Sequence, residues 1–229
     1  MLYEVVVNSW GETTYVPTTL GKVLLSLIFI GLLAAAVFFA RKNFPASEQK
    51  KSGKLTAKQL AFCAVAIALG TVLSNFKLYK FPFGGSITMF SMLVICLPGY
   101  WFGLQAGLMT GFAYGILQLI IDPYVLFPLQ LIVDYPLAFG ALGLSGLFSK
   151  SKHGLVKGYL VAVIGRWVFA VISGWIFFAE YAWEGWAPLP YSLVYNGIYI
   201  FSEAALTMII IVILDMTGAM KQINKIPRE

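Results

Sequence analysis

Three ionisable residues, Asp134, Arg166 and Glu203, lie within long apolar stretches of the sequence. Charged groups inside a membrane are costly, so they usually face a cavity or a partner and usually have a function. If all three are ionised, two carboxylates face one guanidinium, and a surplus charge buried without a partner is unfavourable. A cationic ligand would supply the missing charge. Protonation of Glu203 would balance the group equally well, and a structural ion pair that only fixes helix packing is a further alternative.

More polar and aromatic residues lie at a similar depth. Asn196 precedes Glu203 by seven residues, which places both on one face of a helix. The segment 175–191 (WIFFAEYAWEGWAPLPY) is dense in aromatic residues. An aromatic belt at the membrane interface accounts for some of them. Their flat faces also suit the stacking of a heteroaromatic ring or the binding of a cation.

Motifs of known catalytic devices are missing from the sequence. It has no G-x-x-x-x-G-K-[ST] loop for ATP hydrolysis, and its single histidine, His153, belongs to no zinc-binding or nucleophilic motif. Cys63 and Cys96 both fall in apolar runs, which is typical of small buried side chains. We therefore expect no enzyme and no cofactor. The rival is an intramembrane enzyme with Asp134 and Glu203 as acid and base, and it lacks a supporting motif.

The composition predicts that the bilayer is the main solvent of this chain. Of its 229 residues, 59% are hydrophobic and only 11% are charged, whereas soluble domains have about 25% charged residues. So few charges cannot cover the surface of a soluble globule of this size. The net charge of +6 does not indicate nucleic acid as a partner, because the basic residues flank apolar runs, where such charge sets membrane orientation.

Apolar runs of the length needed to cross a membrane predict an all-α, polytopic membrane protein. The expected spans are residues 20–40, 59–76, 86–101, 103–121, 126–148, 155–178 and 191–215. The span at 86–101 is short and has polar flanks, so it could be tilted or partly re-entrant.

The distribution of Lys and Arg predicts the orientation. With seven spans, one side holds Arg41, Lys42, Lys50, Lys51, Lys54, Lys58, Lys150, Lys152, Lys157, Lys221, Lys225 and Arg228, and the other holds Lys22, Lys77 and Lys80. The positive-inside rule makes the first side cytoplasmic, which puts the N-terminus outside and the C-terminus inside.

Four segments follow from this arrangement. Residues 1–41 form an extracellular segment and an accessory transmembrane helix, 42–58 a basic cytoplasmic linker, 59–220 a six-helix membrane core and 221–229 a cytoplasmic tail. The first helix is expected to be a signal anchor, because the segment before it carries Glu4 and Glu12 in place of a basic region.

Two stretches, 130–148 (QLIVDYPLAFGALGLSGLF) and 166–197 (RWVFAVISGWIFFAEYAWEGWAPLPYSLVYNG), resemble the ThiT family, the thiamine-specific S components of energy-coupling factor (ECF) transporters. The similarity runs from about residue 56 to 215 and leaves out the first helix and the linker. It implies a six-helix core that binds thiamine near the outer face. It also implies partners: a transmembrane coupling subunit and two ATPase subunits.

The resemblance assigns roles to individual residues, carried over position by position. These are Asp134 as the carboxylate that bonds the aminopyrimidine, Tyr135 as its neighbour, Arg166 as a basic pocket residue, Gly174 for close approach of the ligand, Phe178 as a stacking face, and Tyr191 with Asn196 as the polar wall. The chain departs from the family at Ala170, where relatives have histidine, and near Gly85, where they have a loop tryptophan. Glu203 is an addition that could recover affinity for a cation.

Two more features would belong to such a transporter. Residues 77–86 (KLYKFPFGGS) are the expected lid over the site, with flexibility from Gly84 and Gly85. Ala61, Ala64 and Ala68 form a small-residue face that could contact the coupling subunit or pack within the chain. The same transporter class with a thiamine precursor or another heteroaromatic cation remains open, as does a purely structural membrane subunit.

Overall fold

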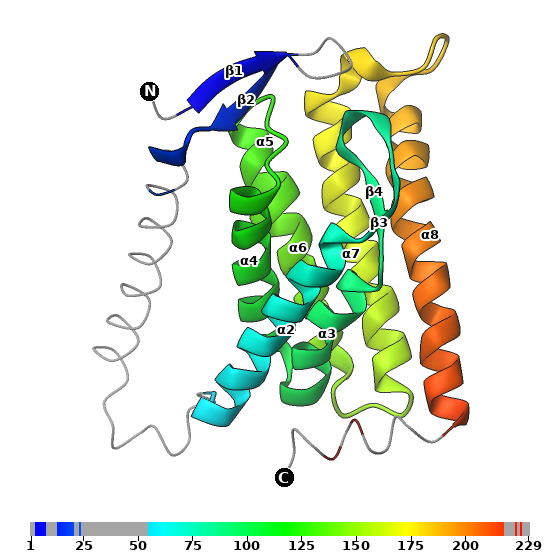
Figure 1. The fold of residues 1–229 in the computed structure, drawn as a ribbon. Helices are drawn as coiled ribbons and strands as arrows, with labels where there is room; N and C mark the ends of the chain where they lie inside the picture. Colours follow the sequence, from blue (N-terminus) through cyan, green and yellow to red (C-terminus); the bar gives the residue numbers. More distant parts are fainter. Residues whose placement is uncertain are drawn as a thin grey trace.

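The computed structural model describes residues 3–7, 13–20, 23, 55–217, 223 and 225, and in this part of the chain most residues form helices that run side by side (Figure 1). The accessory helix expected at 20–40 and the linker at 42–58 lie almost entirely outside the described residues. The tail at 221–229 is described at only two positions.

Six helical segments form the body of the described chain. They are α2 (Ala57–Asn75), α3 (Ser91–Phe102), α4 (Leu104–Ile121), a broken helix from Pro128 to Phe148, α7 (Gly154–Phe177) and α8 (Pro188–Met216). Five of them are long and apolar enough to cross a membrane, and α3 is the shorter one. The prediction of an all-α multi-pass membrane protein is confirmed at this level.

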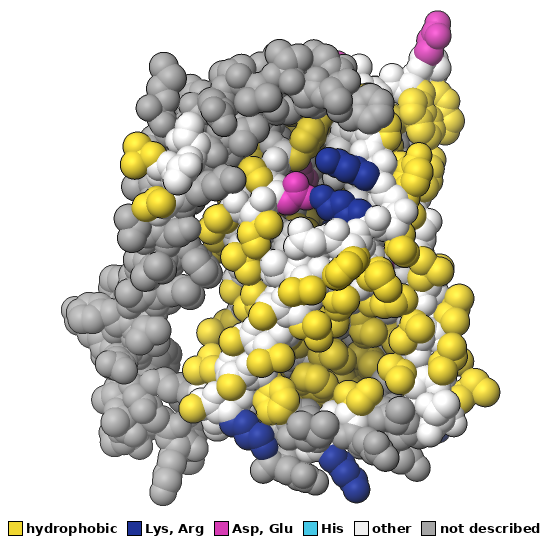
Figure 2. Space-filling model, viewed as in Figure 1, with side chains coloured by type: hydrophobic (Ala, Val, Ile, Leu, Met, Phe, Trp, Pro, Cys, Tyr) yellow, Lys and Arg dark blue, Asp and Glu magenta, His cyan; other side chains and the backbone are white. Residues whose placement is uncertain are grey.

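The outer surface agrees with a bilayer as solvent. Large apolar side chains such as Val65, Ile176 and Ile209 are exposed, and Figure 2 shows hydrophobic side chains over most of one face. Basic side chains lie at the lower edge of that face, and basic and acidic side chains meet nearer its upper part.

The start of α2 follows from a local pattern. The Thr56 hydroxyl accepts a hydrogen bond from the Gln59 backbone N–H (3.2 Å), and the Gln59 side chain accepts one from the Thr56 N–H (2.9 Å). This reciprocal capping satisfies two donors that an unprotected helix end would leave free. The apolar run starts at Leu60, so the capped helix begins just ahead of the span expected at 59–76.

The segment predicted as one span at 126–148 is a helix that changes its winding. It consists of α5 (Pro128–Ile132), a π-helical turn (η2, Val133–Leu137), α6 (Ala138–Gly140) and a 3₁₀ stretch (η3, Ala141–Phe148). Pro136 lies in the π turn and has no N–H to give to the regular helical ladder. Such turns often occur at functional sites, and this one carries Asp134 and Tyr135.

Close helix packing around α3, α4 and η3 depends on glycine. A Cβ on Gly107 would lie 2.5 Å from the Gly143 carbonyl oxygen, and one on Gly146 would meet the backbone of Leu104. Helices in a membrane approach this closely only where small residues face each other. Cys96 is buried in the same region, and its carbonyl accepts a hydrogen bond from Ser145 Oγ at 2.8 Å.

The span expected at 86–101 is partly wrong, because its first residues form a strand. Strand β3 (Lys77–Lys80) pairs antiparallel with β4 (Ser86–Thr88) across the turn η1 (Pro82–Gly84), and α3 begins only at Ser91. Lys77 pairs with Thr88 at the base of this hairpin. A second antiparallel pair, β1 (Tyr3–Val7) and β2 (Thr13–Pro17), lies in the N-terminal segment (Figure 1).

Candidate ligand-binding cavity

A cavity of about 160 Å³ lies between the β3–β4 hairpin and the helices α2, α4, α7, α8 and α5–η2–α6. Seven of the eight predicted site residues line it: Asp134, Tyr135, Arg166, Gly174, Phe178, Tyr191 and Asn196. They come from three helical segments of the sequence, so the fold brings together groups that were predicted to share one site.

Asp134 is held at the cavity wall by a residue that the sequence reasoning missed. Gln130 Nε2 donates to Asp134 Oδ2 at 2.9 Å and to the Tyr124 carbonyl at 3.0 Å. The other side of the same amide, Gln130 Oε1, accepts from the Leu126 N–H at 2.8 Å. Gln130 is buried and stands four residues before Asp134. This i, i+4 spacing on a helix could have pointed to it.

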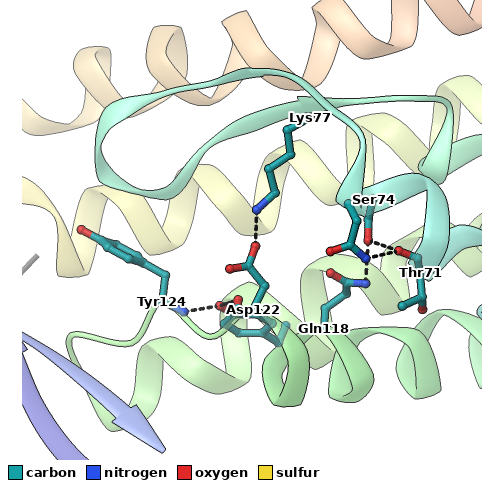
Figure 3. Close-up of polar contacts among 8 residues, drawn as sticks. Thr71, Ser74, Lys77, Gln118, Asp122 and Tyr124 are labelled. Carbon is teal, nitrogen blue, oxygen red and sulfur yellow. Dashed lines mark hydrogen bonds and ion pairs between the residues drawn. The ribbon is translucent and has the colours of Figure 1, made fainter. Parts of the chain in front are cut away.

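Tyr135 contributes its ring to the wall while its hydroxyl is bound to the backbone. The hydroxyl accepts from the Tyr124 N–H at 2.6 Å and donates to the Asp122 carbonyl at 3.1 Å. Figure 3 shows Tyr124 beside Asp122 and Lys77 at this point of the chain. Tyr135 thus fixes the connection between α4 and α5, which lies at the edge of the cavity.

Arg166 packs on an aromatic ring. Its guanidinium carbon lies 4.5 Å from the centroid of the Phe139 ring, a distance at which a cation is attracted to the ring face. No carboxylate of a described residue lies within ion-pair distance of Arg166. The alternative of a structural ion pair between Arg166 and the two buried acids therefore has no support in this part of the chain.

The α7–α8 wall contains a chain of hydrogen bonds. Tyr199 donates to Asn196 Oδ1 at 2.7 Å, and Asn196 Nδ2 donates to the Ser192 carbonyl at 2.9 Å. A Cβ on Gly174 would overlap Ser192 Oγ and lie 3.0 Å from Asn196 Nδ2. Gly174 was predicted to let a ligand approach. In the structure it also lets α7 and α8 approach each other.

Several aromatic rings line the cavity or pack on the rings that do. Phe178 stacks on Tyr124 with an angle of 13° between the rings and 6.1 Å between their centroids. Tyr191 contacts Trp183 and Tyr195 with centroid distances of 5.2 and 5.4 Å. Tyr124 was not predicted as a site residue, because it lies in the connection after α4 and not in the aromatic segment 175–191.

Ser173 is another cavity residue that the sequence reasoning missed. It is 1% exposed, lines the cavity beside Gly174, and its hydroxyl has no hydrogen-bond partner among the described residues. A buried hydroxyl normally has a partner. Ser173 is therefore a candidate to hydrogen-bond a ligand.

Glu203 is the predicted residue that the structure does not bring to the cavity wall. It is 2% exposed and accepts hydrogen bonds from the Thr88 N–H (3.0 Å), Thr88 Oγ1 (2.7 Å) and the Met92 N–H (3.2 Å). These donors stabilise its buried charge without a cation. The hypothesis that a cationic ligand supplies the charge missing beside Glu203 therefore loses its premise.

The expected lid at 77–86 is the β3–β4 hairpin, whose residues line the cavity on one side. Its turn packs on three tyrosines: a Cβ on Gly84 would lie 3.0 Å from Tyr124, one on Gly85 would lie 2.6 Å from Tyr199, and the Phe83 ring lies 4.7 Å from that of Tyr181. Of the two glycines, Gly84 has a positive φ, of 102°, and Gly85 does not, so Gly85 is required for space and not for backbone flexibility.

A second group of polar residues lines the cavity at the base of the hairpin. Lys77 forms an ion pair with Asp122, and Gln118 Nε2 donates to Ser74 Oγ at 3.0 Å (Figure 3). All four residues line the cavity. Lys77 belongs to the predicted lid, whereas Ser74, Gln118 and Asp122 were not predicted, because they lie at helix ends or just beyond.

These features define a multi-pass helical membrane protein with a polar, aromatic-walled cavity under a hairpin, a form suited to binding a small solute. A comparison with known families makes this specific. The model of the thiamine transporter protein family (Thia_YuaJ) matches residues 60–223. The chain belongs to this family, which is one of transporters and not of enzymes.

Individual relatives agree with the family match. The chain is 34% identical over 174 residues to the thiamine transporter ThiT of Bacillus subtilis, covering 70% of this chain and 90% of the relative. It is 33% identical over 129 residues to that of Lacticaseibacillus paracasei, covering 49% and 64%. A solved structure of ThiT from Listeria monocytogenes superposes with a TM-score of 0.62 at 27% identity, covering 70% of this chain and 94% of that one. The resemblance drawn from the sequence is confirmed.

Proposed function

We propose that this chain is the substrate-binding S component of an ECF-type uptake transporter, and that its cavity captures thiamine at the outer face of the bacterial cell membrane. Family membership supports the transporter class. The main support for the binding site is that seven predicted residues, from three helical segments, line one cavity.

The cavity offers groups that match the two halves of thiamine. Asp134, oriented by Gln130, can accept a hydrogen bond from the amino group of the pyrimidine. Phe178 and Tyr124 offer ring faces to the planar heterocycles, where stacking of one base contributes about 1–3 kcal/mol. The negative charge of Asp134 also favours a positively charged ligand in this cavity.

The proposed transporter needs partner subunits. The sequence has no P-loop, so ATP hydrolysis would belong to two ATPase subunits acting through a transmembrane coupling subunit. Ala61, Ala64 and Ala68 are all exposed on α2, which favours contact with a partner over packing within the described chain. We place the coupling contact on this face.

The orientation and the segment boundaries are part of the proposal. We place the N-terminus outside and the C-terminus in the cytoplasm, with 1–41 as the extracellular segment and accessory helix, 42–58 as the linker, 59–220 as the core and 221–229 as the tail. The basic residues of 42–58 and of the region after η3 support this orientation. Access of thiol reagents from each side to single introduced cysteines measures it.

Titration of the purified chain with three ligands tests the function. Thiamine, its pyrimidine alcohol and riboflavin would be added separately, and binding followed by calorimetry. We expect thiamine to bind most tightly, because it fills both the Asp134 end and the aromatic end of the cavity. Tighter binding of the pyrimidine alcohol would indicate a precursor transporter, and binding of none of the three would contradict the proposal.

A further inference from the structure

The buried carboxylate of Glu203 joins α8 to the base of the β3–β4 hairpin. From this geometry we infer that Glu203 is a positioning residue: it fixes the hairpin base as a hinge, so that the turn at 82–85 opens and closes over the cavity. The inference rests on the proposed function only for the identity of the ligand. The anchor itself is a property of the ligand-free chain.

The donors that meet Glu203 come from the corner between β4 and α3. Thr88 gives its N–H and its hydroxyl to Oε2, and the Met92 N–H approaches Oε1 at 3.2 Å. Ser91 Oγ lies 3.4 Å from Oε1 and 2.7 Å from Thr88 Oγ1. Phe90, between these two donors, has a φ of 59° and so adopts the left-handed conformation. It turns the chain so that the N–H groups of Thr88 and Met92 both point to the Glu203 carboxylate.

These contacts are strong because they are charge-assisted and buried. Glu203 is 2%, Ser91 2% and Thr88 8% exposed. Hydrogen bonds to an ionised acceptor are about twice as strong as neutral ones, and exclusion of water strengthens them further. The Glu203 carboxylate also stabilises the N-terminal end of α3, where backbone N–H groups lack helical partners.

The other strand of the hairpin base is held more weakly. Lys77, which pairs with Thr88 across the two strands, forms its ion pair with Asp122 at the end of α4. The Lys77 side chain is 27% and the Asp122 side chain 56% exposed. An exposed ion pair contributes little to stability. The base is therefore fixed mainly on the α8 side, by Glu203.

The turn of the hairpin makes contacts of another kind. Phe83 meets the Tyr181 ring, Phe81 lies 6.2 Å from Tyr199 between ring centroids, and Gly85 packs on Tyr199. These apolar contacts of the turn can separate and re-form while the Glu203 carboxylate keeps its hydrogen-bond donors. Lifting the turn about the fixed base opens the cavity, and the Glu203 anchor returns the turn to the same position over the ligand.

Release kinetics and hydrogen exchange test this hinge in the full-length chain. We would compare Glu203→Gln, Thr88→Val, the double variant and Thr88→Ser, which keeps the hydroxyl donor. Thr207→Val is the matched control, because Thr207 is fully buried one turn further along α8. Each variant would be assayed for thiamine association and dissociation rates, and without ligand for deuterium uptake at 77–92.

We expect Glu203→Gln to raise the dissociation rate about tenfold and Thr88→Val about threefold, with association changed less, since changes at one site act mostly on release. The double variant should release thiamine no faster than Glu203→Gln alone. Thr88→Ser and Thr207→Val should match the wild type. Deuterium uptake at 77–92 should rise in Glu203→Gln and Thr88→Val, while uptake in the rest of α8 stays unchanged.

Wild-type release and uptake in a folded Glu203→Gln chain would overturn the hinge. If that variant does not fold, equal behaviour of Thr88→Val and Thr88→Ser would overturn it instead. Absence of thiamine binding to the wild type would contradict the proposed function. Deuterium uptake at 77–92 in the ligand-free chain would still test the Glu203 anchor, because it compares Glu203→Gln with the wild type without ligand.

Discussion

At the scale of single residues, the sequence reveals some site residues, whereas others depend on contacts between distant parts of the chain. Asp134 could be found from the sequence because a carboxylate in an apolar span is conspicuous. Its partner Gln130 is a neutral residue and was missed, although it lies one helical turn away. Glu203 was equally conspicuous, yet its donors come from Thr88 and Met92. Nothing near Glu203 in the sequence indicates that pairing.

Replacement of Asp134 by Asn tests the carboxylate directly. The variant keeps the size of the side chain and removes its charge, so it loses a charge-assisted hydrogen bond to the ligand. We expect thiamine binding to weaken by about 1–3 kcal/mol, measured by calorimetry on the purified chain. Glu184→Gln removes the same charge from an exposed loop and should bind like the wild type. Equal affinity of Asp134→Asn and wild type would remove Asp134 from the site.

At the scale of elements, periodicity and apolar length located the helices but not their irregular parts. The spans expected at 59–76 and 103–121 match α2 and α4 within two residues. The π turn around Pro136 and the strand at Ser86–Thr88 were not foreseen. Both depend on tertiary contacts: the turn is placed by the hydroxyl of Tyr135 on the 122–124 backbone, and the strand by its pairing with β3.

The exposed alanine face of α2 makes an element-scale prediction. Ala64→Trp should leave thiamine binding by the isolated chain unchanged, because Ala64 does not line the cavity. It should prevent copurification of the coupling subunit and the ATPases, because a bulky side chain keeps two helices apart. Ile164→Trp, at a 49% exposed position of α7, is the control and should keep the complex. A complex that survives Ala64→Trp would place the coupling contact elsewhere.

At the scale of the whole molecule, composition predicted that the chain lies in a membrane, and the stretches at 130–148 and 166–197 predicted its family. An apolar content of 59% with 11% charge requires a bilayer, and the exposed side chains of α2, α7 and α8 agree with it. Most of the buried polar side chains of the described residues line the cavity or contact the hairpin base. The volume and closure of that cavity could not be predicted, because they depend on how the turn at 82–85 packs on Tyr124 and Tyr199.

Identification of the ligand that copurifies with the chain tests the central claim most directly. The protein would be purified from cells grown with thiamine, denatured, and the released small molecules identified by mass spectrometry. We predict thiamine in near-equimolar amount from the wild type and a strongly reduced amount from Asp134→Asn. Release of a different compound, or of equal thiamine from both proteins, would contradict the account.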